Sequence, residues 1–268
     1  MSKKLFTLEL YRAFSSKRLW IIVILIFMIM LASISEFISA AVIHGAASAI
    51  GVLDKMMEIL IFDRFKALMI LLLSGVVSYT LSDDLSSHFI RTVLEKVTVS
   101  EYVTVKLLVN AISVIAILLI SFSLFFFFGR LVLGMPSFSL YSTGADNFGY
   151  YAVLITHVPW LYVPLSAILF GLFASAMTTF GMAVSALYPG RYLAYAFPFG
   201  LFYLMHSFST TFPKPLSFWY ICSGVQVLPV NGFILNYMYG VGVFICLILA
   251  SAIFLYHNMQ RRFTNGNI

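Results

Sequence analysis

The sequence predicts an all-α membrane protein with six transmembrane helices, and three observations support this fold class. Hydrophobic residues make up 62% of the 268 positions and charged residues 10%, whereas soluble domains carry about 25% charged residues. Apolar runs of about 20 residues, the length that a helix needs to cross a bilayer, recur along the chain. The few charges gather between these runs. We therefore expect one transmembrane domain over residues 1–268, multi-pass in a cell membrane, most simply the bacterial plasma membrane.

The first element is predicted to be an interfacial amphipathic helix within residues 1–18. At 100° per residue, three apolar side chains share one side of this helix: Phe6, Leu10 and Phe14. Glu9 and Arg12 fall on the opposite side. A helix with such a pattern lies along the inner membrane surface, and Trp20 marks the interface where the first span begins.

Six apolar runs are predicted spans: residues 20–41, 65–81, 103–128, 160–187, 192–208 and 233–256. Lys and Arg are enriched in cytoplasmic loops. With the N-terminus inside, eleven of the sixteen Lys and Arg residues lie on the cytoplasmic side. The remaining five lie outside: Lys55, Arg64, Lys66, Arg130 and Lys214. This bias predicts an N-in, C-in topology, and the net charge of +6 indicates contact with anionic headgroups rather than nucleic acid.

The fourth predicted span carries a stripe of small residues at i,i+3 and i,i+4 spacing: Gly171, Ala174, Ser175, Thr178 and Gly181. Small residues allow the backbones of membrane helices to approach closely. We expect this stripe to pack against another helix of the same subunit or across a dimer. A tight cytoplasmic turn at Pro189 and Gly190 leads into the fifth span.

The loop between the second and third spans, residues 82–102, concentrates charge. Its apolar residues Leu85, Phe89 and Val93 repeat every four positions, which predicts an amphipathic helix over 83–97 with Ser82 as its N-cap. The opposite side carries charges of both signs and a histidine: Asp84, His88, Arg91 and Glu95. Mixed charge favours docking of a soluble partner, because headgroup binding alone would favour Lys and Arg. A solvated loop with a membrane-lying helix is the alternative. Ser100 is expected to cap the helix that enters the third span.

The order "HFIRTVLEKVTVSEYVTVKLL" resembles the stretch that follows the second span in type-2 ABC transporter permeases. The matching residues are Ile90, Arg91, Leu94, Val99, Ser100, Tyr102 and Lys106. The sequence departs from the pattern at His88, where Gly is common, and at Glu101, where Arg is common. The six-span layout, the N-terminal interfacial helix and the tight turn before the fifth span match the same family.

This resemblance implies the transmembrane subunit of an ATP-binding cassette exporter, which forms half of a pathway for a hydrophobic or amphipathic cargo such as a peptide, antibiotic or lipid. It implies a second permease subunit, identical or related. Seven residues would couple the chain to the ATPase: Asp84, His88, Arg91, Glu95, Ser100, Glu101 and Tyr102. The chain has no G-x-x-x-x-G-K-[ST] loop. A separate ATPase subunit would therefore bind ATP and magnesium, and this chain would be a transport subunit rather than an enzyme.

The outer segment 209–232 is too apolar for a free loop and, with three prolines, too broken for a span. Re-entrant or interfacial helices are expected there. Near the outer boundary, Glu36 and His206 form a hypothetical gate, with water-wetted interfacial groups as the simpler interpretation. Cys222 and Cys246 lack the spacing of a metal site or disulfide.

Two other functions are weighed against the exporter. A membrane-embedded enzyme would need polar residues clustered at one membrane face, and the sequence assembles none. An ATP-independent carrier, or the membrane subunit of an importer, often has charged or broken helices at the midplane. Pro198 interrupts the fifth span, but no intramembrane charge accompanies it.

Overall fold

The computed structural model is helical, and the residues that it describes contain no strand. The described residues are 3–35, 51–61, 63–86, 89–137, 151–188, 191–209, 211–224, 226–229 and 232–264. The all-α fold class predicted from the sequence is thereby confirmed for this part of the chain.

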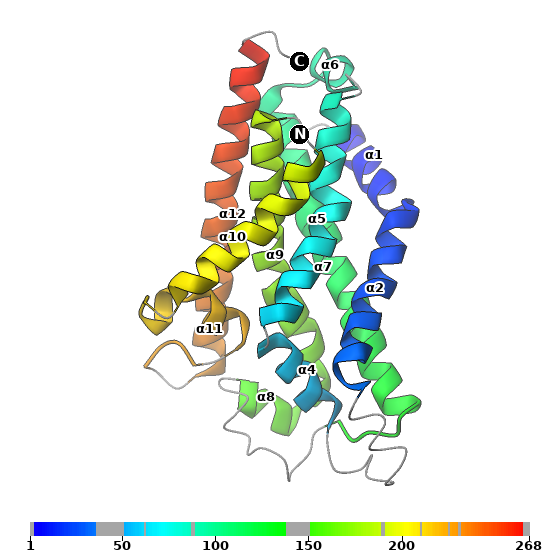
Figure 1. Ribbon diagram of the computed structural model, residues 1–268, viewed down its shortest axis with the longest axis vertical. Coiled ribbons are helices and arrows are strands. Elements are labelled where there is room, and N and C mark those ends of the chain that lie inside the picture. The colour runs from blue at the N-terminus through cyan, green and yellow to red at the C-terminus, as the bar shows by residue number, and fades with distance from the viewer. Residues whose placement is uncertain are drawn as a thin grey trace.

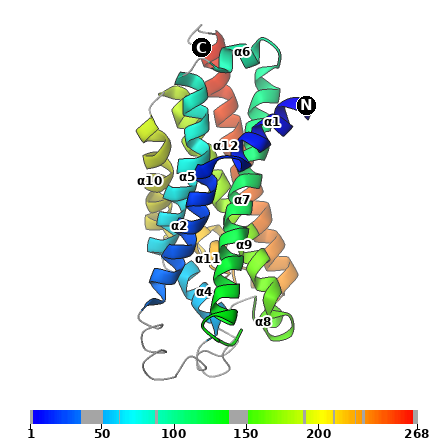
Figure 2. The same ribbon diagram turned by 90° about the vertical axis from the view of Figure 1, so that its right-hand side faces the viewer.

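Most of the long helices lie along the long axis of the molecule, whereas the helix of residues 191–209 runs obliquely across them, and the short helices lie toward the two ends (Figure 1). The long helices are α2 (Lys17–Ser33), α5 (Asp63–Ser86), α7 (Val99–Leu131), α9 (Tyr162–Leu187), α10 (Arg191–Ser209) and α12 (Phe233–Thr264). The shorter ones are α1 (Lys3–Phe14), α4 (Val52–Ile61), α6 (Phe89–Leu94), α8 (Ala152–His157) and α11 (Phe218–Cys222), with 3-10 turns at Pro159–Leu161 and Lys214–Leu216. Both termini lie toward the end that carries α6, whereas α4, α8 and α11 lie toward the other (Figures 1 and 2).

Four described helices are long and apolar enough to cross a membrane: Arg64–Ser86, Val99–Leu131, Pro159–Leu187 and Phe233–Thr264. The pair α1 and α2, bent by 52° at the short break between them, is a fifth if it is taken as one broken span. The protein is therefore a helical protein with the properties of a multi-pass membrane protein. α10 does not reach the same mean hydropathy, so a sixth span remains a prediction.

α9 is the central helix of the bundle. It packs against α5, α7, α10 and α12, and 78% of its span is buried compared with 22% for α12. The small residues of α9 allow these contacts. A Cβ added at Gly171 would lie 2.8 Å from the side chain of Ile115, and one at Gly181 would lie 2.6 Å from that of Pro198. The predicted close packing of this stripe is confirmed within the chain, against α7 and α10.

The loop between the second and third spans is shorter than expected, and the prediction of one helix over 83–97 is wrong. α5 continues through Ser86, and α6 is a separate helix of six residues. The hydropathy falls after Leu81, but the helix continues past this point, because the backbone hydrogen bonds of α5 do not need apolar side chains. The N-cap of α7 is Thr98, whose hydroxyl accepts a hydrogen bond from the amide of Glu101 at 3.3 Å. Ser100 is not the cap and lies exposed in the first turn of α7.

The end of the bundle opposite α6 contains more packed structure than the sequence indicated. α4 lies in a segment expected to be a loop, and most of its side chains are buried. Lys66, which was counted among the five charges on the outer side of the membrane, is 1% exposed and lies in the first turns of α5. The 209–232 segment holds a 3-10 turn and α11, in agreement with the expectation of short helices. Pro198 lies inside α10 without ending it.

Candidate functional site

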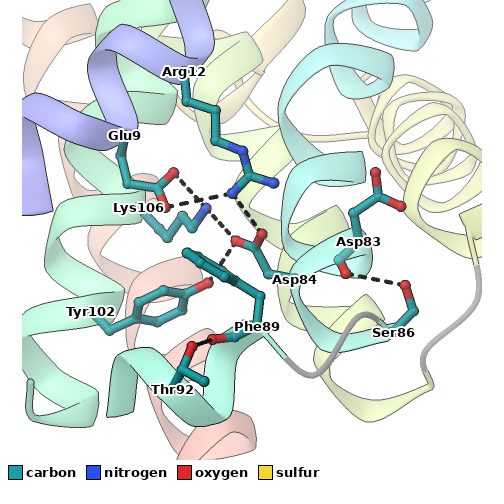
Figure 3. Close-up of polar contacts among 9 residues, drawn as sticks. All are labelled: Glu9, Arg12, Asp83, Asp84, Ser86, Phe89, Thr92, Tyr102 and Lys106. Carbon is teal, nitrogen blue, oxygen red and sulfur yellow. Dashed lines mark hydrogen bonds and ion pairs between the residues drawn. The ribbon is translucent and has the colours of Figure 1, made fainter. Parts of the chain in front are cut away.

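Three helices bring ionisable side chains together near the end of the bundle that holds α6. α1 crosses α7 and directs Glu9 and Arg12, which are three residues apart, toward it. α7 contributes Tyr102 and Lys106, which are four residues apart and thus on one face. Asp84 comes from the last turn of α5. Figure 3 shows these five side chains converging, and we call them the charge network.

Asp84 is at the centre of the charge network. One of its carboxylate oxygens lies 2.7 Å from Nη1 of Arg12. The other lies 2.7 Å from Nζ of Lys106 and accepts a hydrogen bond of 3.1 Å from the Tyr102 hydroxyl. Lys106 also donates to Glu9 Oε2 at 2.7 Å. The network therefore joins α5 to α1 and α7 through direct contacts between charged groups (Figure 3).

The charge network lies inside the protein and is electrically balanced. Asp84 is 0% exposed, and Glu9 and Lys106 are each 4% exposed at the side chain. Two carboxylates face two cations, so the network as a whole carries no net charge. Removing ions from water is unfavourable, and the loss is offset only when the ions are paired and hydrogen-bonded, as Asp84 and Lys106 are.

Arg12 is the most exposed charged member of the network. Its side chain is 43% exposed and its guanidinium lies 5.6 Å from the ring centre of Phe89. Burial lowers the pKa of Arg12, but the hydrogen bond to Asp84 and the charges of Asp84 and Glu9 raise it by more, so its pKa is raised overall. Arg12 is therefore a permanent cation at the edge of the network.

The place of Asp84 in α5 reverses the sequence-based interpretation. The pattern suggested that Asp83 and Asp84 begin a helix, where the helix dipole favours carboxylates. They lie instead in the last turn of α5, where the helix dipole disfavours carboxylates by about 0.3–1 kcal/mol. The pairing with Lys106 offsets this, because a buried carboxylate left without its partner would cost about 3–5 kcal/mol. Tertiary contacts therefore determine where Asp84 lies.

The residues predicted to couple to an ATPase divide into two groups. Asp84 and Tyr102 are buried in the charge network, so the expectation that Asp84 lies on an exposed docking face is wrong. The others are accessible: Arg91, Glu95 and Ser100 are exposed, and Glu101 is partly exposed. His88 lies outside the described residues.

α1 also differs from the predicted interfacial helix. The three predicted apolar residues Phe6, Leu10 and Phe14 are partly buried, as a helix packed on the bundle requires. Glu9 was expected on the polar side of the helix, opposite these apolar residues. This expectation is wrong, because Glu9 faces α7 and pairs with Lys106. The sequence signals the burial of Glu9 only in that this carboxylate lies directly between two apolar residues, Leu8 and Leu10.

The sequence patterns did not single out Glu9, Arg12 and Lys106 as site residues. Lys106 appeared only in the family pattern. Lys106 lies close to the start of an apolar span and four residues from a tyrosine. This position was the signal in the sequence, because a lysine buried there needs an anion nearby.

The hypothetical outer gate cannot be assembled from the described residues, because Glu36 lies outside them. The ring of His206 stacks on Phe202 with 6.4 Å between ring centres. His206 also lines a small pocket with Lys66 and Trp219. Lys66 Nζ lies 5.1 Å from the ring centre of Trp219 and donates to Ser223 Oγ at 3.3 Å. The structure thus places His206 beside a buried cation.

A second polar contact joins α7 to α9 within the bundle. The Asn110 amide donates to the Ser175 carbonyl at 3.0 Å and to Thr179 Oγ1 at 2.8 Å, and its oxygen accepts from Thr178 Oγ1 at 3.0 Å. Every polar group in this contact is satisfied, which is typical of a structural link between membrane helices. Among the described residues, no three His, Cys, Asp or Glu side chains group closely enough to hold a metal ion.

Comparisons with known proteins leave the family open: no family model, no curated protein and no solved structure matches this chain.

Proposed function

We propose that this chain is the transmembrane subunit of an ATP-binding cassette exporter of the type-2 permease kind, in the cell membrane. A separate ATPase subunit would supply ATP hydrolysis, and a second permease subunit would complete a pathway for a hydrophobic or amphipathic cargo. The observation that supports this proposal is the arrangement of α6 and the charge network. α6 is short, follows α5 directly, and lies at the end of the bundle near both termini (Figures 1 and 2).

The charge network explains how a push on α6 would reach the membrane helices. α6 packs against the end of α5, and Asp84, two residues before the end of α5, is bound to α1 and α7. A force on α6 would therefore displace these three helices together. Such rigid-body movement of helices about an interface is a common way to convert a local contact into opening of a pathway.

The exposed polar residues of this region suit contact with a soluble partner. Arg91 and Glu95 are four residues apart and exposed, so charges of opposite sign face away from the bundle. Paired charges of this kind favour a specific partner over general attraction to lipid.

The direct test is affinity purification of the chain from its native membrane in mild detergent. We expect a soluble ATPase with a phosphate-binding loop in stoichiometric amount. The charge exchange Arg91→Glu with Glu95→Arg should reduce the recovered ATPase, and Lys214→Glu, an exposed change at the opposite end, should not. No ATPase with the unaltered chain would refute the exporter and favour an ATP-independent carrier.

The topology has a separate test. Single cysteines at Ser86 and Thr211, both exposed and near opposite ends of the bundle, should react with a membrane-impermeant maleimide from opposite sides of the membrane. Labelling from the same side would contradict the proposed orientation.

A further inference from the structure

A polar pocket lies beside the charge network, at the bend between α1 and α2. Its volume is about 120 Å³, which is several times the roughly 10–15 Å³ that one water molecule needs. Its walls come from α1 and the bend, from α5 and from α7. The α5 wall includes Asp83, and the α7 wall includes Lys106 and Ser113.

Two buried polar atoms in the pocket walls, Glu9 Oε1 and Ser113 Oγ, have no hydrogen-bond partner in the part of the chain that the structure describes. Their residues are 4% and 1% exposed. The Arg12 Nη1 atom is 3.8 Å from Glu9 Oε1, which is too far for a hydrogen bond. A buried carboxylate oxygen without a donor is unfavourable by about 1–3 kcal/mol or more. The pocket is therefore suited to a ligand that brings a hydrogen-bond donor to Glu9.

Charges of both signs line the pocket. Arg12, Arg18 and Lys106 are cationic, and Glu9 and Asp83 are anionic. Asp84 supplies a third negative charge from behind Arg12 and Lys106. The positive and negative groups are therefore equal in number. A ligand that is itself neutral overall but carries both charges fits this balance, whereas a simple cation or anion would disturb it.

Trp20 indicates that the bend between α1 and α2 lies at the depth of lipid headgroups. Trp20 follows the bend, is 49% exposed, and donates its indole N–H to the carbonyl of Phe14 at 3.2 Å. Exposed tryptophan is enriched at this depth, where an apolar ring and a polar N–H are both accommodated. Arg18, two residues before Trp20, lines the pocket and is exposed.

We propose that this pocket binds the zwitterionic headgroup of a phosphoethanolamine lipid. The primary ammonium donates to Glu9 Oε1 and lies near Ser113 Oγ, and the phosphate faces Arg18, whose guanidinium has five N–H donors. A choline headgroup has no N–H to donate, and a glycerol headgroup leaves the phosphate charge unbalanced. This inference needs the membrane location of the chain but does not depend on the ATPase partner.

The test is native mass spectrometry of the full chain in mild detergent, titrated with phosphatidylethanolamine, phosphatidylcholine and phosphatidylglycerol of matched acyl chains. We expect the ethanolamine lipid to bind at least about tenfold more tightly than the choline lipid, because it alone supplies a charged donor to Glu9. Equal affinity for these two lipids would overturn the proposal and leave the pocket to water. Stronger binding of the glycerol lipid would identify an anion site instead.

Variants locate the lipid in the pocket. Glu9→Gln should weaken binding of the ethanolamine lipid by about tenfold, because it removes a charged partner. Ser113→Ala should weaken binding by about threefold, because it removes a neutral partner. Ser123→Ala, on the same helix but outside the pocket, should bind as the unaltered chain does. Ser113→Ala leaves every ion pair in place, so it decides the matter if Glu9→Gln fails to fold. Unchanged affinity in Ser113→Ala would refute the assignment.

Competition identifies the source of the headgroup. Free phosphoethanolamine should displace the lipid only weakly, because it lacks the acyl chains that hold the lipid at the bend. If the free compound binds as tightly as the lipid, the ligand is a soluble molecule and the lipid assignment is wrong. Displacement by inorganic phosphate at the same concentration would refute the zwitterionic site.

Discussion

The buried ion pair between Asp84 and Lys106 makes a quantitative prediction about stability. The two side chains are 0% and 4% exposed, and their charged atoms are 2.7 Å apart. Asp84→Asn leaves Lys106 with Glu9 alone, and Lys106→Met leaves two carboxylates facing only Arg12. Removal of one partner from a buried pair costs about 3–5 kcal/mol of unfolding free energy, and we expect each single variant to fall in this range.

Arg12 adds little to this value. Its side chain is 43% exposed, so solvent screens its attraction to Asp84, and an exposed pair contributes at most about 1 kcal/mol. The Tyr102 hydrogen bond survives in Asp84→Asn, because the amide oxygen can accept it. Lys106 therefore accounts for most of the expected loss.

The double variant Asp84→Asn with Lys106→Met distinguishes pairing from a general packing effect. It removes one charge of each sign and leaves Glu9 with Arg12. The loss of unfolding free energy in the double variant should therefore be smaller than the sum of the two single losses by about 2 kcal/mol or more. The measurement is the unfolding free energy in mixed detergent micelles, followed by far-ultraviolet circular dichroism during titration with SDS. Glu95→Gln, an exposed change in the same region, serves as the control.

The result that would refute this reasoning is additivity. If the losses of the two single variants sum to that of the double variant within about 0.5 kcal/mol, Asp84 and Lys106 do not interact. A loss below about 1 kcal/mol in each single variant would show that water reaches the network and screens it.

Two further predictions concern packing and thiol reactivity. Gly181→Ala should destabilise the protein by about 1–3 kcal/mol in the same SDS titration, because the added Cβ would lie 2.6 Å from Pro198. An added Cβ at Gly200 would have nothing within 4 Å, so Gly200→Ala should be neutral or stabilising by up to about 1 kcal/mol. Equal effects of the two variants would contradict the close contact of α9 with α10. Burial raises the pKa of Cys222 to about 12, so its thiol stays protonated from pH 7 to 9 and should react with a maleimide only after the protein is unfolded in SDS. Mass spectrometry of the Cys222 peptide measures this, and modification at pH 8 in mild detergent would show that this site opens to solvent.

The sequence by itself determined the features that depend on local pattern. Long apolar runs are sufficient to predict membrane helices, because every backbone polar group in a bilayer must be satisfied within the helix. The stripe of small residues in α9 predicted close packing for a similar local reason. The limits of α5 and α6 were missed, because hydropathy ended before the helix did.

Only the tertiary structure decided which charges meet. Glu9 and Lys106 are 97 residues apart, and Arg12 and Asp84 are 72 apart, so no local pattern connects them. A carboxylate on an amphipathic helix gives the same periodicity whether it faces water or a lysine on the next helix. The crossing of α1 over α7 buries Glu9 and brings it to Lys106, and that crossing depends on packing between helices that are distant in the sequence.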